Sequence, residues 1–456
     1  MAEPWEAYLA EHEEQHLEEL KEFLRIPSVS ALPEHDADVR RAAEWVADQL
    51  RRSGVPVVEL MPTARNPVVF GAWHVADDRP TAMIYGHYDV QPPDPLELWE
   101  TPPFEPSVRD GRIYARGASD DKGNAFIPIK AVEALAATQG GPRINLTFFF
   151  EGEEEIGSPS LPAFVREHRD RLACDFVISA DGGMFGPNDP SLTVASKGLA
   201  ACQIDLRTAA TDLHSGEYGA AVPNAVQQLV QLVATFHTAD GRVGIDGFYD
   251  AVRDLTPEER AELAAIPFDE EQYREQLGVR ALWGEPDYSV LERLWARPTL
   301  DFNGIWGGFQ GEGIKTVTPA EAHVKVTCRL VPDQDPGQVL DLIERHVERF
   351  CPPGATASVR RFPGAARPFT IRRDHPALQT ARRVLAELYG KEPLVTRLGG
   401  TLPVADIFQR ELGADLVFFA FGMPDAQIHA PNESFRLDAF TMGRRAYCAY
   451  LNALAG

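Results

Sequence analysis

Short apolar runs that end in acidic residues or histidine recur along the first 180 residues of the chain. Residues 81–85 lead into Gly-His-Tyr-Asp, residues 144–150 lead into Glu-Gly-Glu-Glu-Glu, and residues 175–180 lead into an aspartate and two glycines. Runs of this length and apolarity are typical of strands buried on both faces. A further strand at 68–70 is predicted to lie beside 81–85. Because helical segments separate the later runs, the pattern predicts a mostly parallel sheet flanked by helices.

The pattern changes near residue 197. Two segments, 199–207 and 321–331, alternate between apolar and polar positions, which is typical of antiparallel strands exposed on one face. The same block contains predicted helices at 223–236 and 337–349, a strand at 357–362 and a charged, mostly helical stretch at 250–295. The parallel-sheet pattern resumes near residue 375, with predicted helices at 376–389, 403–411 and 436–453 and a strand at 416–421. We therefore predict an α/β domain made of residues 1–196 and 373–456, interrupted by an α+β domain of residues 197–372.

Composition and charge narrow the possible partners of the chain. Its 456 residues are 44% hydrophobic and 25% charged, and their formal net charge is −24 with a pI of about 4.9. This balance argues against binding to nucleic acid or to an anionic membrane surface. The five cysteines are scattered without a C-x-x-C pattern, which indicates reduced thiols and a cytoplasmic protein. A basic, apolar leader and an apolar run of about 18 residues are both missing, so we expect neither secretion nor a membrane span.

The predicted N-terminal helix, residues 5–24, contains the sequence His-Glu-Glu-Gln-His from His12 to His16. This matches the H-E-x-x-H pattern of zinc peptidases, and Glu34 and His35 follow as possible third ligands. The pattern also arises by chance in glutamate-rich helices, and a zinc-peptidase helix should be buried against a sheet. We therefore favour a surface helix that carries two histidines.

A second set of candidate ligands lies where the predicted strands end. Two histidines and several carboxylates of this kind suit a pair of borderline divalent ions. Each also has a simpler explanation: a core histidine bonded to an aspartate, an aspartate that caps a helix, or a charged run on a solvated face. The run Glu151–Glu155 follows a very apolar strand, where like charges favour a bound cation, and it must turn if Glu154 and Glu155 are to serve one site. The set is His87, Asp89, Asp120, Glu154, Glu155, Asp181 and His429.

Six motifs in the same order resemble a known enzyme family over nearly the whole chain. They are GHYDVQP from residue 86, RGASDDKG from 116, FEGEEEIGS from 150, DLHSGEYG from 212, RLVPDQDP from 329 and IHAPNES from 428. The chain resembles the cytosolic non-specific dipeptidase, or carnosinase-like, branch of the two-metal aminoacylase–carboxypeptidase G superfamily. The resemblance implies that the first domain is a di-zinc exopeptidase-like catalytic domain and that the inserted domain is a lid and dimerisation domain.

The resemblance also implies a role for each candidate ligand. His87 and Asp181 would bind one metal ion, Glu155 and His429 would bind the other, and Asp120 would bridge both. Asp89 would orient His87, and Glu154 would be the general base that activates a water molecule. The peptide bond between Asp120 and Asp121 would be cis. The cofactor would be two divalent ions per subunit, with Zn²⁺ preferred and Mn²⁺ also suitable.

Further residues match the family's substrate-binding positions. His214 would reach the active site of a partner subunit and stabilise the oxyanion, while Thr316, Arg329 and the turn of Gly400 and Thr401 would hold the substrate's carboxylate and backbone. The relatives have serine where this chain has Thr401. Without the resemblance, Arg329 could form a strand salt bridge and His214 could cap a turn.

The implied function is metal-dependent hydrolysis of dipeptides by a homodimer that dimerises through the inserted domain. One alternative keeps the same site and makes the substrate an N-acyl amino acid, as in a deacetylase or desuccinylase. The stretches EGEEEIGS and VPDQDP favour dipeptides over that alternative. A second alternative is a non-catalytic metal-binding or scaffolding protein, which the complete set of expected catalytic residues argues against.

Overall fold

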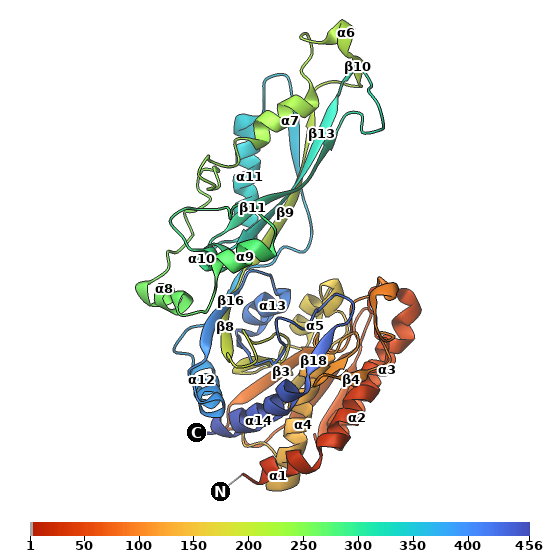
Figure 1. Ribbon diagram of the computed structural model, residues 1–456, viewed down its shortest axis with the longest axis vertical. Helices are drawn as coiled ribbons and strands as arrows, with labels where there is room; N and C mark the ends of the chain where they lie inside the picture. Colours follow the sequence, from red (N-terminus) through yellow and green to blue (C-terminus); the bar gives the residue numbers. More distant parts are fainter. Residues whose placement is uncertain (1–2) are drawn as a thin grey trace. The chain divides into compact units, whose positions relative to one another are not determined.

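The computed structural model describes residues 3–456, which fold as two compact units (Figure 1). The first unit contains the described residues up to Val194 together with 371–396 and 407–456, and the second contains 195–370 and 397–406. The segment 397–406, which our sequence boundaries placed in the first domain, therefore lies in the second unit. The chain crosses from one unit to the other four times. Three of these crossings fall within or at the end of strands of one small sheet, β15 (Phe369–Thr370), β8 (Ser191–Ser196) and β16 (Leu394–Leu398).

A six-stranded sheet forms the centre of the first unit. Its order is β1 (Val57–Met61), β2 (Val68–Trp73), β6 (Asn145–Glu151), β3 (Thr81–His87), β7 (Phe176–Ser179) and β17 (Asp415–Phe418). The last four strands run parallel, whereas β1 and β2 are antiparallel to their neighbours. The predicted pairing of 68–70 with 81–85 is wrong, because β6 lies between β2 and β3. All seven residues of β6 are buried, so this strand takes an interior position.

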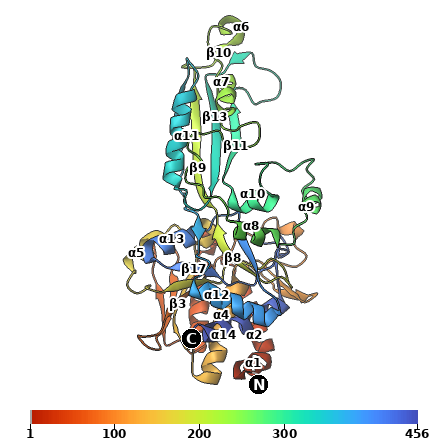
Figure 2. The same cartoon turned by 90° about the vertical axis from the view of Figure 1, so that its left-hand side faces the viewer.

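Helices cover both faces of this sheet (Figure 2). Phe149 of β6 packs against Phe164 of α5 and Phe408 of α13 on one face. Its neighbour Phe148 points the opposite way, toward Leu50 of α3. The predicted N-terminal helix is divided at His12 into two helices that pack on α4. The helices are α1 (Pro4–Glu11), α2 (Glu13–Leu24), α3 (Asp36–Arg52), α4 (Lys122–Gln139), α5 (Leu161–Glu167), α12 (Pro376–Tyr389), α13 (Pro403–Leu412) and α14 (Leu437–Ala453).

The second unit is built on an antiparallel sheet of order β11 (Thr299–Gly307), β13 (Glu321–Leu330), β9 (Gly198–Arg207) and β14 (Thr356–Arg361). Buried and more exposed residues alternate along β13, as predicted. The buried side packs on α7 (Ala225–Val233) and α11 (Pro336–Phe350). Shorter elements complete the unit: β10 (Leu213–His214), α6 (Ser215–Tyr218), α8 (Pro257–Ala264), α9 (Glu270–Gln276), α10 (Val290–Ala296) and β12 (Val317–Thr318).

These two units confirm the predicted fold class, a mostly parallel sheet flanked by helices and joined to an antiparallel α+β unit. Another small sheet in the first unit joins β18 (Ser434–Arg436), β5 (Arg112–Tyr114) and β4 (Ser107–Arg109). Within residues 3–456, no helix combines the length and the apolar character needed to cross a membrane. The four parallel strands bring their carboxyl ends to one edge of the sheet, where open α/β sheets bind ligands.

Candidate metal centre

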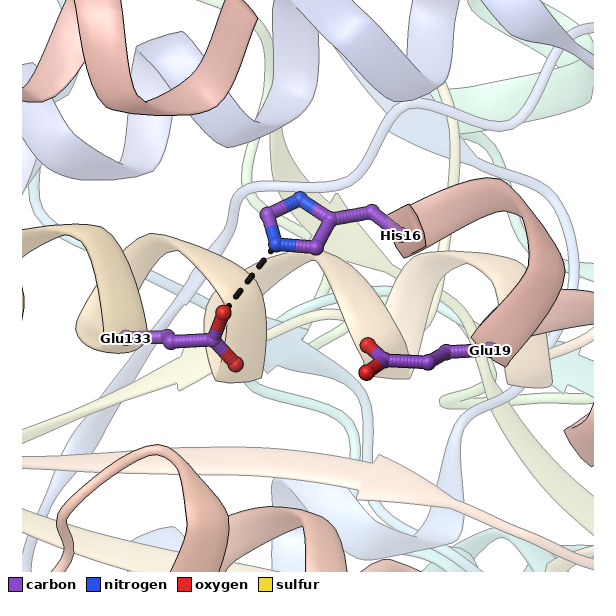
Figure 3. A group of neighbouring side chains, drawn as sticks. All are labelled: His16, Glu19 and Glu133. Carbon is purple, nitrogen blue, oxygen red and sulfur yellow. Dashed lines mark hydrogen bonds and ion pairs between the residues drawn. The ribbon is translucent and has the colours of Figure 1, made fainter. Parts of the chain in front are cut away.

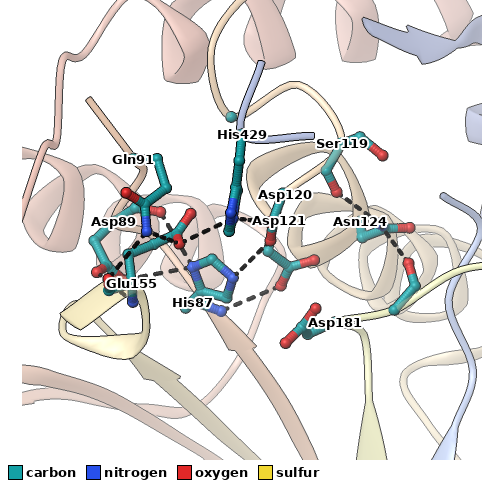
Figure 4. A network of polar contacts seen from close by, with 12 residues as sticks. His87, Asp89, Gln91, Ser119, Asp120, Asp121, Asn124, Glu155, Asp181 and His429 are labelled. Carbon is teal, nitrogen blue, oxygen red and sulfur yellow. Dashed lines mark hydrogen bonds and ion pairs between the residues drawn. The ribbon is translucent and has the colours of Figure 1, made fainter. Parts of the chain in front are cut away.

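The predicted ligands of the first unit meet at this edge of the sheet (Figure 4). His87 is the last residue of β3, and Glu155 lies in the 3₁₀ turn Glu154–Ile156 that follows β6. Asp181 follows β7, and His429 lies in the loop after β17. Asp120 precedes α4 and lies between the two histidines. Five chain segments therefore supply one cluster.

Asp120 links the two imidazoles through its two carboxylate oxygens. Its Oδ1 lies 3.1 Å from Nε2 of His87, and its Oδ2 lies 2.9 Å from Nε2 of His429. Asp120 belongs to two groups whose ligand atoms lie within 4.8 Å of one another: one contains His87 and Asp181, and the other contains Glu155 and His429. One carboxylate shared by two ligand sets is the arrangement expected of a two-metal centre.

Further contacts hold the ligands in place. Nδ1 of His87 lies 3.1 Å from the backbone oxygen of Asp89 and 3.4 Å from its Oδ1. Oδ2 of Asp89 accepts a hydrogen bond from the backbone N–H of Glu155 at 3.1 Å. Gln91 Nε2 donates to Glu155 Oε2 at 2.8 Å, and this same oxygen lies 3.2 Å from His429. Gln91 belongs to the motif that supplies His87, but its amide gave no sign in the sequence that it would support the second ligand group.

The glutamate run after β6 divides into structural residues and site residues. Glu151 accepts hydrogen bonds from Tyr85 and Ser158, both at 2.9 Å. Glu153 accepts from the backbone N–H groups of Asn66 and Ser160. The turn required by the sequence is present, since Glu154 begins a 3₁₀ segment that closes at a left-handed Gly157. It follows that only Glu154 and Glu155 remain for the metal cluster.

The cluster is strongly acidic, and the pKa values of its members reflect this. Burial, assisted by neighbouring carboxylates, raises the pKa of Asp181 to about 7 and raises the pKa of Glu154 well above its usual value. Hydrogen bonds from His429 to Asp120 and Glu155 raise the pKa of His429 to about 10. Buried like charges of this kind are stabilised by bound cations.

Two backbone features mark the same loops. The peptide bond between Asp120 and Asp121 is cis, as the resemblance implied. His429 has a φ of +59°, and Gln427 and Asn432 in the same loop also have positive φ values. Positive φ values are costly for residues other than glycine and cluster at functional sites.

The residues present fit a pair of divalent ions. Oε1 of Glu155 is buried and has no hydrogen-bond partner among the described residues. Two imidazole nitrogens and the carboxylate oxygens of Asp120, Glu155 and Asp181 form a nitrogen and oxygen donor set suited to Zn²⁺ or Mn²⁺.

The remaining predicted residues lie in the second unit, in two separate groups. His214 and Thr316 are neighbours, because β10 pairs with β12 and Ser215 N–H donates to the Thr316 carbonyl at 3.1 Å. His214 is exposed, and its Nδ1 accepts a hydrogen bond from Gly216 N–H at 3.1 Å. This bond makes His214 the N-cap of α6, and the other ring nitrogen, Nε2, does not take part in it. Arg329 Nη1 donates to Thr401 Oγ1 at 2.7 Å, and the Gly400 carbonyl accepts from Lys197 N–H at 3.0 Å.

A third group of possible metal ligands consists of His16 and Glu19 on α2 and Glu133 on α4 (Figure 3). His16 Nε2 contacts Glu133 Oε1 at 3.1 Å, and Lys130 Nζ lies 2.7 Å from Glu19 and 2.6 Å from Glu133. Arg444 Nη1 donates to Nδ1 of His16 at 2.8 Å. Each of these side chains has a partner in the protein, so we interpret the cluster as a buried ion-pair network. The prediction of a surface helix is wrong at His16, which is fully buried because α2 packs against α4.

This network predicts a pH dependence of stability. Since Arg444 can only donate, Nδ1 of His16 must accept, and His16 is neutral with its proton on Nε2. Burial lowers the pKa of His16 below its usual value near 6.5. The unfolded chain therefore binds an extra proton below pH 6.5, and the free energy of unfolding should fall by up to about 1.4 kcal/mol per pH unit.

The measurement is urea unfolding at pH 7.5, 6.5 and 5.5. His16→Gln should flatten the slope below pH 6.5 relative to the unchanged chain. His12→Gln is the control and should keep the slope, because His16 stays in place. Equal slopes for all three proteins would contradict the assignment of the neutral state to His16.

Comparison with known proteins adds a further line of evidence. Residues 83–453 match Peptidase family M20/M25/M40. The chain is 29% identical to a Beta-Ala-His dipeptidase of Homo sapiens, covering 98% of this chain and 92% of the relative. It is 30% identical to a Cys-Gly metallodipeptidase of Schizosaccharomyces pombe, covering 96% and 94%. Among solved structures, an M20 family metallo-carboxypeptidase from Sulfolobus solfataricus aligns with a TM-score of 0.83 and 32% identity, covering 96% of this chain and 99% of the other.

Proposed function

Because the chain belongs to Peptidase family M20/M25/M40, we propose that it is a metallodipeptidase that hydrolyses dipeptides with two divalent ions. The observation that carries the proposal is the position of Asp120, shared by two ligand groups at the carboxyl ends of parallel strands. His87, Asp120 and Asp181 would hold one ion, and Asp120, Glu155 and His429 the other. Zn²⁺ is the preferred ion and Mn²⁺ also suits these ligands.

Glu154 is the proposed general base. When bound, the ions supply Lewis acidity to the scissile carbonyl and lower the pKa of a water molecule. Glu154 takes a proton from that water and later delivers it to the leaving amine. Asp89 keeps His87 in one orientation through the contacts at Nδ1. The turn Glu154–Ile156 supports this assignment, since it presents the base directly beside the ligand Glu155.

The residues of the second unit are the proposed substrate-binding groups. Arg329, with Thr401 beside it, offers a guanidinium that can bind the free carboxylate of the substrate through two hydrogen bonds. Gly400 and Thr316 would contact the substrate's backbone. Nε2 of His214 would donate to the oxyanion that forms on the scissile carbonyl, a contact typically worth a few kcal/mol.

The distances within the second unit support a homodimer. His214 and Thr316 adjoin the Glu321 end of β13, whereas Arg329 lies eight residues along that strand (Figure 1). At 3.3–3.4 Å per residue, Glu321 and Arg329 are about 27 Å apart along β13. An extended dipeptide spans only about 7 Å. One copy of the unit cannot place both groups on one dipeptide, so we propose that His214 and its neighbour Thr316 act together in the site of a partner subunit.

The edge strand β11 offers a surface for such a partner. Phe302 and Ile305 on this strand are exposed by 38% and 54%. An unpaired strand edge with exposed apolar side chains favours association with a second copy. We also propose a cytoplasmic location, supported by the five free cysteines.

The test of this function is one panel of substrates offered to protein loaded with Zn²⁺ or Mn²⁺. It contains L-dipeptides, tripeptides, N-acetyl amino acids and N-succinyl amino acids. We expect cleavage of the dipeptides. Cleavage of tripeptides from the carboxyl end would instead favour a carboxypeptidase. The similarity to the metallo-carboxypeptidase of Sulfolobus solfataricus is the reason to include tripeptides in the panel. Cleavage of N-acyl amino acids alone would favour an amidohydrolase that uses the same site.

Changing Arg329 should weaken substrate binding selectively. Arg329→Met removes the guanidinium, and a charged hydrogen-bond pair is worth about 1.5–3 kcal/mol, so kcat/KM for a dipeptide should fall about 10- to 150-fold. The same dipeptide as its C-terminal amide has no carboxylate, so its already low kcat/KM should change little. Equal losses for the acid and the amide would contradict the carboxylate-binding role.

A further inference from the structure

Glu433 lies four residues after His429 and is fully buried. Its Oε1 accepts hydrogen bonds from the backbone N–H groups of Ser119 at 2.9 Å and Asp120 at 3.0 Å. Its Oε2 accepts from Gly117 N–H at 2.9 Å and from Arg116 Nη1 at 2.7 Å. One carboxylate therefore joins the loop that carries Asp120 to the segment that carries His429.

Asn124 makes a second junction to the same loop, through Ser119 (Figure 4). Its Nδ2 donates to the carbonyl of Ser119 at 2.9 Å and, less tightly, to the carbonyl of Gly182 at 3.4 Å. Its Oδ1 accepts from Phe421 N–H at 2.8 Å. Gly182 directly follows Asp181, so Asn124 joins the Asp120 loop to the first ligand group.

The two junctions meet a physical need of the cluster. The ligand segments carry carboxylates that repel one another, and Asp120, Glu155 and Asp181 come from separate parts of the chain. Some residues do not bind the metal themselves but hold the segments that carry its ligands. Replacing such a residue commonly lowers the metal affinity about 10- to 100-fold.

We propose that Glu433 is a positioning residue for the second ligand group, Asp120, Glu155 and His429. It fixes the distance between the shared ligand Asp120 and His429, and it does so without contacting substrate or metal. The inference rests on the proposed two-metal function. Asn124 is its counterpart for the group that contains Asp181.

The experiment is a Co²⁺ titration of metal-free protein, followed by visible absorption, with thermal unfolding measured in parallel. His429→Ala and Asp181→Asn identify which binding step belongs to which ligand group. Glu433→Gln should weaken the step lost in His429→Ala by about 10- to 100-fold and the other step less. Asn124→Ala should show the opposite preference.

Asn145 supplies the matched structural control. It is a buried asparagine at the start of β6, at the opposite end of the sheet, and its side chain makes four hydrogen bonds to the backbone of residues 75–79. Asn145→Ala should lower the unfolding temperature and leave both Co²⁺ steps unchanged. If Glu433→Gln does not fold, Glu433→Gln combined with Arg116→Met removes both buried charges together and should show the same preference.

The outcomes separate the two hypotheses. Equal weakening of both steps by Glu433→Gln, or unchanged steps with only a lower unfolding temperature, would overturn the positioning role while the two-metal site stands. Loss of Co²⁺ affinity in Asn145→Ala would show general loosening of the fold and would also overturn it. If the unchanged protein binds no Co²⁺, or if the two ligand variants remove no step, the two-metal function itself fails and the inference fails with it.

Discussion

Glu154→Gln should slow dipeptide hydrolysis severely while the protein still binds two metal ions. Glutamine keeps the shape of the side chain but cannot take a proton from water. A positioned general base contributes about 10²- to 10⁴-fold to the rate, so kcat should fall by that amount with little change in KM. Glu154 lies outside both ligand groups, so the metal content should stay at the level of the unchanged enzyme. The measurements are steady-state kinetics and metal analysis of the same preparation.

Two neighbouring glutamates are the controls for this change. Glu155→Gln alters a proposed ligand of the second group and should lower the metal content as well as activity. Glu153→Gln disturbs hydrogen bonds to Asn66 and Ser160 and should lower stability more than kcat. Activity that survives Glu154→Gln would show that another group is the base, and loss of metal in that variant would show that Glu154 is a ligand.

The sequence predicted three of the five segments that carry the cluster, because their ligands come at the end of an apolar run. His87, Glu155 and Asp181 follow strands whose residues are buried on both faces, and parallel strands bring such positions together. The roles assigned to them came from the resemblance. Spacing alone left the simpler explanations open, since a buried histidine beside an aspartate has the same pattern.

Other features depend on contacts between distant segments, which local patterns do not encode. The strand β6 lies between β2 and β3 because all of its residues are buried and it pairs on both sides. The order of the strands along the chain does not reveal this arrangement. Glu151 and Glu153 resemble Glu154 and Glu155 in sequence, and only their partners Tyr85 and Asn66 distinguish them. His16 is buried because Arg444 and Glu133 surround it, although it lies in a glutamate-rich stretch typical of a surface.

Glu433 illustrates the same limit at the site itself. It belongs to the motif IHAPNES that contains His429, and nothing in that motif explains an acid at this position. The reason is a set of three N–H groups and a guanidinium more than 300 residues earlier in the chain. Loop segments that hold metal ligands are specified by such long-range hydrogen bonds.

Two inactive variants should restore activity when they are combined in one dimer. His214→Ala removes the proposed oxyanion donor, and such a loss costs about 10²- to 10³-fold in kcat. Glu154→Gln removes the proposed general base. In a heterodimer of the two, the cluster of the His214→Ala subunit keeps Glu154 and receives His214 from the partner. One of the two sites is then complete, so the heterodimer should show about half of the normal kcat per dimer.

The heterodimer can be isolated by expressing the two variants together with different affinity tags. The control pairs an unchanged subunit with one that carries both changes. In that pair, one site lacks His214 and the other lacks Glu154, so both sites should be inactive although one subunit is unaltered. If His214 instead acted in its own subunit, the results would be reversed: the first heterodimer would be inactive and the control would retain about half of the activity. The two heterodimers carry the same two substitutions, and the two arrangements predict opposite activities for them. The comparison therefore decides whether His214, which adjoins the end of β13 that lies about 27 Å from Arg329, acts in the site of a second copy.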